Sequence, residues 1–225
     1  MPPEFADLFA DQPDLLASHR GWDAGALELA QQLAQAFSCP LFFSTTTRLL
    51  VDLNRSIGHK SLHAPQVQLL SAAKRQIIIQ QYYAPHRAAV VDQIDALSAA
   101  KKTVLHVAAH SFTPQLDGIV RNADVGLLYD PRRAAEKSFA QCWAATLGRA
   151  HADLKVRRNY PYHGKDDGLT SFLRKRIPDP NYIGIELEVN QRAVSPGQNH
   201  WERLKDSLVQ SLLGAVSRAT LNHGP

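Results

Sequence analysis

The strongest strand signal in the sequence is Thr103-Val104-Leu105-His106-Val107-Ala108-Ala109. This stretch is almost uninterruptedly apolar and contains several β-branched residues. Continuous apolar character is typical of a strand that is covered on both faces, as in a parallel or mixed sheet. The sequence therefore predicts a central sheet with helices on both sides.

Outward from this strand, predicted strands alternate with predicted helices. The other strands are Leu41–Phe43, Leu49–Leu53, Val125–Tyr129, Leu154–Val156 and Tyr182–Val189, and the helices are Ala24–Leu33, Ala72–Lys101, Arg133–Leu147 and Trp201–Leu221. Asp23 is placed to cap the first helix, and Pro85 should break or kink the second. The alternation predicts an α/β fold, a three-layer α/β/α sandwich with a mixed, largely parallel sheet. A length of 225 residues suits one domain over residues 1–225.

The composition is that of an ordinary globular protein, with 44% apolar and 20% charged residues. No stretch approaches the roughly 20 apolar residues that cross a bilayer, and Met1–Phe5 does not begin a secretory signal. We therefore expect a cytoplasmic protein without a membrane partner. The net charge of +4 comes from 25 basic and 21 acidic residues, and the basic ones occur in short pairs. Solvated surface explains them better than nucleic-acid binding, and an anion pocket is the second interpretation.

The two cysteines, Cys39 and Cys142, form no Cys-x-x-Cys pair and indicate no disulfide framework. Their apolar surroundings predict free thiols that pack as small hydrophobic side chains, without a catalytic role. His106 lies within the apolar strand and is expected to be a hydrogen-bonded histidine of the interior. The sequence carries no signal of oligomeric state.

Polar residues that follow the strands are the candidates for function, because ligand sites of α/β folds collect beyond the carboxyl ends of strands. His110 could ligate a metal or move a proton, or be a satisfied core histidine. Arg55 offers a planar fork for a carboxylate, with Asn54 beside it as a directional donor. The alternative is a surface arginine that pairs with a nearby acid.

Glu186 and Glu188 share one face of their strand, because side chains alternate along a strand. Buried carboxylates are costly unless they are paired or functional, so one could be a general base with a raised pKa. A polar strand face in contact with solvent is an equal alternative. The segment Asn159–Gly164 is either a pocket wall or an ordinary turn. His19 and Asp23 could each either cap a helix or ligate a metal.

Taken together, six segments resemble one family. They are Ser18–Ala26, Arg48–Ser56, His110–Pro114, Arg121–Gly126, Arg158–Tyr162 and Ile185–Gln191, and their order and spacing are maintained from Ser18 to Gln191. The family is that of N-formylglutamate amidohydrolase, in its shorter branch, and it is similar in fold to zinc carboxypeptidases.

The resemblance implies zinc-dependent hydrolysis of the amide bond of an N-acyl amino acid, such as N-formylglutamate, to formate and the amino acid. It implies His110 as a metal ligand, Asp23 as a ligand or orienting carboxylate, and Glu188 as the general acid and base. Asn54 and Arg55, together with Asn159 and Tyr162 of the Asn-x-Pro-Tyr loop, would bind the substrate. Small N-acyl amino acids or dicarboxylates are therefore the expected partners.

One departure from the family concerns the beginning of the sequence. Members of this branch usually open with a strand that ends in a Cys-Glu-His-Gly-Gly-Asn type motif, and Met1 falls about where that motif has just ended. We therefore expect a sheet that lacks one strand and an incomplete three-ligand zinc site, which neither His19 nor His59 is assigned to complete. The alternative function is a catalytically impaired relative that binds small carboxylates without metal.

Overall fold

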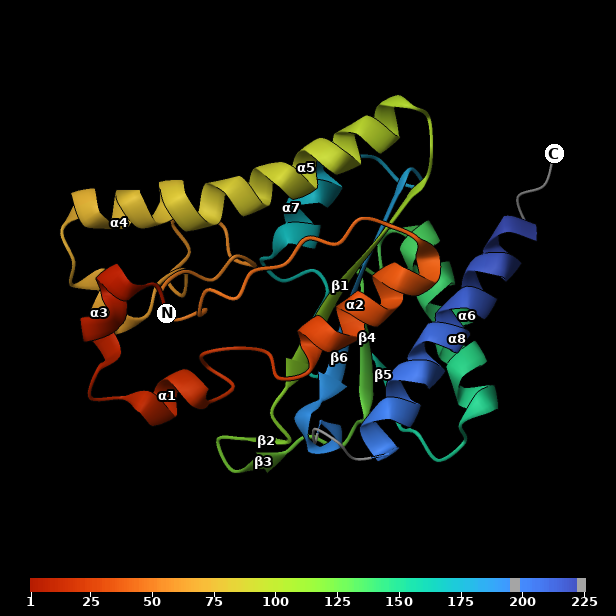
Figure 1. Cartoon of the computed structure of the whole chain (residues 1–225). Coiled ribbons are helices and arrows are strands. Elements are labelled where there is room, and N and C mark those ends of the chain that lie inside the picture. The colour runs from red at the N-terminus through yellow and green to blue at the C-terminus, as the bar shows by residue number, and fades with distance from the viewer. Residues whose placement is uncertain (195–198, 222–225) are drawn as a thin grey trace.

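The structure is a computed structural model that describes residues 1–194 and 199–221. At its centre lies a four-stranded sheet in the order β1-β6-β4-β5 (Figure 1). The strands are β1 (Val104–Phe112), β4 (Val125–Leu128), β5 (Val156–Arg158) and β6 (Tyr182–Asn190). The pairs β1/β6 and β4/β5 are parallel and β4/β6 is antiparallel. The prediction of a mixed, largely parallel sheet is confirmed.

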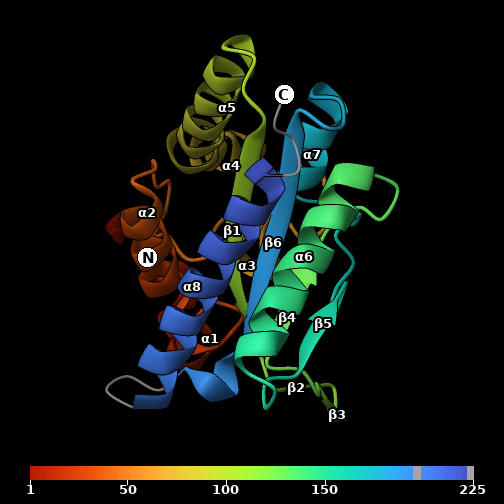
Figure 2. The ribbon, with the colours of Figure 1, turned by 90° about the vertical axis from the view of Figure 1, so that its right-hand side faces the viewer.

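Helices cover both faces of this sheet. The helices α2 (Ala26–Phe37), α6 (Ala134–Ala150) and α8 (Asn199–Leu221) share one core cluster with β4 and with Ile185, Leu187 and Val189 of β6. Figure 2 shows α6 and α8 in front of the strands. The opposite face packs against α5 (Ala84–Ala99) and α7 (Leu169–Arg176). The three-layer α/β/α sandwich is therefore confirmed.

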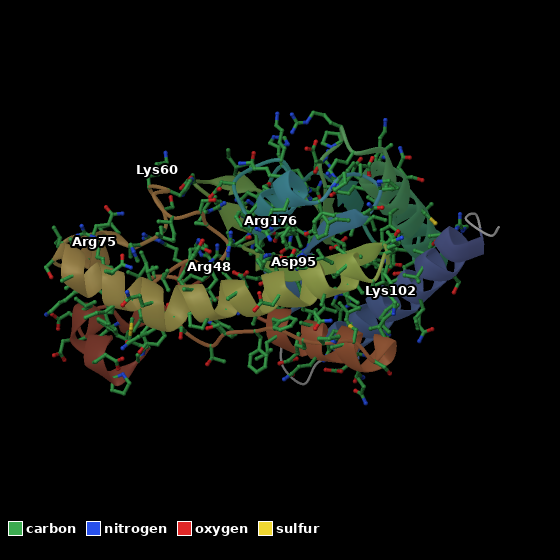
Figure 3. All side chains as sticks on the ribbon, turned by 90° about the horizontal axis from the view of Figure 1, so that it is seen from above. Arg48, Lys60, Arg75, Asp95, Lys102 and Arg176 are labelled. Carbon is green, nitrogen blue, oxygen red and sulfur yellow. The ribbon has the colours of Figure 1, made fainter. Side chains whose placement is uncertain are left out.

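The face under α5 and α7 is the one that carries polar side chains of the strands. His106 on β1 is hydrogen-bonded there, with 2.8 Å between its Nδ1 and the hydroxyl of Tyr182. Burial lowers the pKa of His106 to about 4, so the ring is neutral. The prediction of an interior, hydrogen-bonded histidine is confirmed. On the same side, an ion pair of 2.6 Å joins Arg176 of α7 to Asp95 of α5 (Figure 3).

The long helical region runs as three segments end to end, which Figure 1 shows along the top of the molecule: α4 (Ala72–Ile78), the π-helical η2 (Ile79–Tyr83) and α5. Pro85 stands at the start of α5. Because proline has no N–H and crowds the preceding turn, the hydrogen-bond ladder must change there. The interruption that the sequence predicts takes the form of a π-helical turn.

The predictions of strands at Leu41–Phe43 and Leu49–Leu53 are wrong. The first segment has no regular secondary structure and pairs with no strand in the described structure, and the second forms turns. Leu49, Leu50 and Val51 are buried in a separate apolar cluster, which also contains residues of η1 (Pro3–Phe9), α3 (Pro65–Gln68) and α4. A short apolar run has no periodicity that separates a buried strand from a buried turn.

The remaining elements are short, and they are α1 (Pro13–Ala17), the hairpin of β2 (Gln115–Leu116) with β3 (Ile119–Val120), and η3 (Gln191–Ala193). Both cysteines are free. Cys142 packs against the core, but Cys39 is exposed just beyond α2, so the prediction that it is packed is wrong. No helix in the described part of the chain is long and apolar enough to cross a bilayer.

Candidate active site

The centre of the site is a pair of residues that stand opposite each other on neighbouring strands. His110 of β1 and Glu188 of β6 are register partners, which we call a rung. Adjacent strands lie about 5 Å apart. Glu188 points away from the α6 and α8 core, to the same face as Glu186 and Tyr182. The strands thus bring together an imidazole and a carboxyl group that are distant in sequence.

Asp23 holds the ring of His110, with 2.7 Å between its Oδ2 and Nδ1 of the imidazole. The other oxygen, Oδ1, accepts a 2.5 Å hydrogen bond from Nη1 of Arg48. Nη2 of Arg48 donates to Oδ2 of Asp52 over 2.9 Å. A carboxylate in this position fixes the orientation of an imidazole and stabilises its charged form.

The structure excludes one of the two interpretations of Asp23, that of a helix cap. The first residue of α2 is preceded by Gly25 with a φ of 76°, and no side chain caps the helix. The prediction of Asp23 as an N-cap is therefore wrong. Both of its oxygens are used by His110 and Arg48, which is the geometry of an orienting carboxylate.

Charge around the rung shifts the pKa of His110 upward. Burial of the ring favours the neutral form, but the hydrogen bond and charge of Asp23, together with Glu188 and Glu186, more than offset it and raise the pKa to about 9. Burial also opposes ionisation of Asp23, yet His110 and Arg48 lower the pKa of that carboxyl group overall. At neutral pH the pair is an imidazolium and a carboxylate.

Glu188 has the opposite environment from Asp23. It is 5% exposed, and its Oε2 has no hydrogen-bond partner among the described residues. Burial, assisted by the negative charges of Asp23 and Glu186, raises its pKa to about 7, although His110 and Arg48 act in the other direction. A carboxyl group of this kind can exchange a proton near neutral pH.

Glu186 differs from Glu188 although both share one face. Its Oε1 accepts a 2.5 Å hydrogen bond from the hydroxyl of Thr170, so one of its oxygens is satisfied by α7. Glu186 is 8% exposed. Neither glutamate faces solvent, so the interpretation of this strand face as a solvated one is wrong.

Asn54 and Arg55 lie next to the rung that carries Glu186. A Cβ added to Gly168 would lie 3.0 Å from Oδ1 of Asn54 and 3.3 Å from Oε1 of Glu186, so these two side chains flank the same glycine. Oδ1 of Asn54 also accepts a 2.8 Å hydrogen bond from the backbone N–H of Leu169. Asn54 therefore positions the start of α7 through its oxygen.

Arg55 keeps part of its guanidinium group without a partner. Nη1 donates to the backbone oxygen of Asp167, while the buried Nε makes no hydrogen bond in the described structure and lies 4.0 Å from Oδ2 of Asp52. An unsatisfied buried donor is costly. The free edge of the guanidinium is suited to a planar carboxylate.

The loop that contains Asn159 and Tyr162 lies against the rung of His110 and Glu188. A Cβ added to Gly126, the β4 partner of Glu188, would meet the backbone oxygen of Tyr160 at 2.0 Å and Cβ of Glu188 at 3.2 Å. Only glycine allows this close approach. The loop therefore packs directly beside Glu188, and its role as a wall of the substrate pocket stays a prediction.

The two loop residues have different contacts. Oδ1 of Asn159 accepts hydrogen bonds from the backbone N–H groups of Tyr129 (3.0 Å) and Gly164 (3.1 Å), so it holds the loop. The hydroxyl of Tyr162 accepts a 3.1 Å hydrogen bond from Nη1 of Arg121. Substrate binding by either residue stays a prediction.

A groove of about 890 Å³ adjoins the site along β1. Asp23, Arg48, Asn54 and His110 line it together with every residue of β1 from Val104 to Ala109. In the part of the chain that the structure describes, β1 pairs only with β6, so its other edge faces this groove without a ladder partner. Much of the remaining wall is apolar and comes from α2, α5 and the segment after α2.

Two residues of this region were not singled out from the sequence. Arg48 and Arg121 each lie in a segment that carries the family resemblance, and their partners are distant in sequence, so only the fold reveals their contacts. His19 is exposed, and Nδ1 of His59 accepts a hydrogen bond of 3.1 Å from the backbone of Ser61. The described residues contain no group of three His, Cys, Asp or Glu side chains placed to hold a metal ion.

The fold and the site define a class of protein, an α/β sandwich whose sheet carries a histidine and a carboxyl group on one rung. A model of the N-formylglutamate amidohydrolase family matches residues 1–195. The chain belongs to the N-formylglutamate amidohydrolase family, which confirms the resemblance found in the sequence.

Two solved structures are similar to this chain in fold. The chain is similar to gene product Atu2144 from Agrobacterium tumefaciens, with a TM-score of 0.83 and 27% sequence identity, covering 98% of this chain and 87% of that one. The fold is also that of N-formylglutamate amidohydrolase from Ralstonia eutropha JMP134, with a TM-score of 0.63 and 18% identity over 86% of this chain and 81% of that one. No curated protein matches the chain.

Proposed function

We propose that this protein hydrolyses the amide bond of an N-acyl amino acid, with N-formylglutamate as the first substrate to test. Membership of the family supports an amidohydrolase. The single observation that carries the proposal is the rung of His110 and Glu188, in which a held imidazolium stands beside a carboxyl group with an unpaired oxygen. We keep a cytoplasmic location as a prediction.

In the proposed reaction, ionised Glu188 takes a proton from a water molecule, and the hydroxyl oxygen adds to the carbonyl carbon of the amide. The negative charge that develops on the carbonyl oxygen is stabilised by the imidazolium of His110, which Asp23 keeps protonated and in place. The protonated Glu188 then gives its proton to the amide nitrogen as the C–N bond breaks. The products of N-formylglutamate would be formate and glutamate.

The substrate carboxylate is assigned to Arg55. Its buried Nε lacks a hydrogen bond among the described residues, and a bidentate carboxylate would satisfy it. Asn54 holds the neighbouring start of α7 through Leu169 and so keeps the arginine segment in position. Binding there would orient the amide on the adjacent rungs.

Zinc dependence stays a prediction from the family resemblance. The ring of His110 could offer only Nε2, because Nδ1 is bonded to Asp23, and both oxygens of Asp23 are engaged. A catalytic zinc site usually has three protein ligands, and the described residues contain no such group. His110 and Asp23 by themselves do not fit a zinc ion. The proposed reaction therefore uses only side chains of the protein and a water molecule.

The proposal is tested by hydrolysis of N-formylglutamate with wild type and Glu188→Gln, each with and without added zinc. Loss of the base should lower kcat by about 10²- to 10⁴-fold. Glu202→Gln, at an exposed position on α8, is the matched control and should keep wild-type activity. Equal rates for wild type and Glu188→Gln would remove Glu188 from the mechanism.

A second candidate function is supported by the finding that the described residues hold no complete set of metal ligands. In that case the protein binds small carboxylates through Arg55 without hydrolysing them. Calorimetry with glutamate would then show binding that Arg55→Met weakens, while no hydrolysis occurs under any metal condition. Hydrolysis that depends on Glu188 would contradict this alternative.

A further inference from the structure

Residues 40–46, which we call the return segment, connect α2 to the turns before Asn54 without using their backbone groups. The segment has no regular secondary structure, and its backbone forms no hydrogen bond to any other element that the structure describes. The N–H of Thr46 donates only locally, to Oγ of Ser44. Phe42 is 37% exposed and Phe43 is 54% exposed. Free backbone groups and exposed aromatic rings both favour a more closely packed position.

The outer edge of β1 presents the complementary backbone groups. The N–H of Val104 donates to the backbone oxygen of Asn181, at the start of the pairing with β6. Backbone groups of successive residues point to opposite edges of a strand. Those of Leu105, Val107 and Ala109 therefore point away from β6, and they have no ladder partner among the described residues.

The return segment and this edge of β1 border the same groove. All seven residues of the segment line it, as do Leu105, Val107 and Ala109, and its volume of about 890 Å³ has room for about 30 water molecules. Figure 1 shows the chain after α2 returning in the same direction as β1. Pairing between the two would therefore be parallel, like the pairing of β1 with β6.

Both ends of the return segment are fixed, so its middle is the part that can move. At its start, the N–H of Cys39 donates to the backbone oxygen of Ala34 over 3.1 Å. At its end, the backbone oxygen of Gly21 accepts 2.9 Å hydrogen bonds from the hydroxyl of Thr47 and from the N–H of Arg48. These anchors keep the segment alongside β1 while its middle approaches or leaves the strand.

The residue types of the segment suit a strand in this position. Leu-Phe-Phe-Ser-Thr-Thr is rich in aromatic and β-branched side chains, which fit a pleated surface. The groove has apolar walls on two sides, with Leu33 from α2 and with Val90 and Ile94 from α5. Because side chains alternate along a strand, Phe42 and Phe43 would each meet one of these walls.

We propose that the return segment is a strap that closes onto β1 as a fifth, parallel strand of the sheet. Closure gives ladder partners to both backbones and covers the exposed edge of β1. It also removes water from the groove that His110 lines, so opening of the strap is the step that admits a ligand from this side. Closure is a property of the free protein and does not depend on hydrolysis.

Hydrogen exchange of single backbone amides, measured by NMR on the full chain without ligand, tests closure. The amides of Leu105, Val107 and Ala109 should exchange at least about 10-fold more slowly than in an unstructured peptide, because a closed population of about 90% protects them to that extent. The amide of His106 points to β6. It should be protected in every folded variant and serves as the internal reference.

Phe42→Pro and Phe43→Pro each remove one N–H at an exposed position. Since adjacent N–H groups point to opposite edges, the proline whose N–H would face β1 should return the three amides to nearly unprotected exchange, and the other should have a smaller effect. Ile57→Ala, at a position that is 64% exposed and outside the segment, is the control and should keep wild-type protection.

Unprotected exchange of the three amides in wild type would overturn the proposal. Protection that survives in both proline variants would also overturn it, because burial in the groove would then explain the slow exchange without pairing. If the proline variants fail to fold, the double variant Phe42→Ser/Phe43→Ser replaces them, since it removes only the apolar side chains. It should speed exchange of the three amides by at least a few-fold, and unchanged rates would count against the strap.

Discussion

His110 and Glu188 share one rung of the sheet, and their surroundings raise the pKa of both groups through different causes. Asp23 provides a negative partner at 2.7 Å that raises the pKa of the imidazole to about 9. Burial without a partner for Oε2 raises the pKa of Glu188 to about 7. Between these values the pair is an imidazolium beside a carboxylate, the state that the proposed reaction requires.

We therefore predict a bell-shaped dependence of kcat/KM on pH for the metal-free protein. The rate should rise as pH passes about 7, because Glu188 must lose its proton to act as a base, and fall above about 9, because His110 must keep its proton. Initial rates with N-formylglutamate from pH 5 to pH 10 measure both limbs. A rate that does not change between pH 5 and pH 8 would contradict the assignment of Glu188.

Asp23→Asn should shift the alkaline limb of that profile to lower pH. Asparagine keeps an oxygen near Nδ1 of His110 but removes the charge, so the pKa of the imidazole should fall by at least about one unit. NMR titration of the ring of His110 measures the shift directly. Asp95→Asn, in the surface ion pair with Arg176, should leave it unchanged. An unchanged pKa of His110 in Asp23→Asn would show that the charge of Asp23 does not raise it.

The sequence predicted the strands of this site better than it predicted their contacts. A continuous apolar run identified β1, because a strand buried on both faces needs one. The strand β6 was also predicted, although Glu186 and Glu188 interrupt its apolar residues. The partners of Asp23 could not be predicted in the same way, since His110 and Arg48 are 87 and 25 residues away in the chain. The sequence indicated a helix cap for Asp23, because capping depends only on neighbouring residues. In the structure Asp23 instead contacts His110 and Arg48.

Arg55 and the segment Leu49–Leu53 also show that the sequence does not predict contacts between distant residues. Leu49–Leu53 has strand-type residues, but its apolar side chains are buried among short helices, and the segment forms turns. The position of Asn54 beside Glu186 depends on the absence of a side chain at Gly168. Only the packed fold shows that Asn54 lies beside Glu186. The residue types Asn and Arg were enough to predict a carboxylate-binding site, but not its position.

Gly126→Ala should lower both stability and hydrolysis. The added Cβ would meet the backbone oxygen of Tyr160 at 2.0 Å, so the loop beside Glu188 must move, at a cost of about 1–3 kcal/mol. Gly148→Ala is the matched control, because nothing lies within 4 Å of the added atom in α6, and a helical alanine should stabilise by about 0.5–1 kcal/mol. Thermal unfolding and kcat/KM of both variants test the contrast. Full activity in Gly126→Ala would show that the loop is no wall of the site.

Glu136→Gln should be among the most destabilising single changes that keep the size of a side chain. Glu136 is fully buried, lies 2.9 Å from Nε of Arg174 and 3.2 Å from Nε of Arg133, and accepts the backbone N–H of Gly184 on β6.

Neutralising Glu136 leaves two largely buried guanidinium groups without a counter-ion, which should cost about 3–5 kcal/mol in the free energy of unfolding. Glu202→Gln removes only an exposed partner of Lys205 and should cost no more than about 1 kcal/mol. Urea unfolding of the two variants gives the comparison. Similar losses in both would mean that the buried ion pairs contribute no more than surface ones, and that Arg174 needs no counter-ion to join α7 to the sheet.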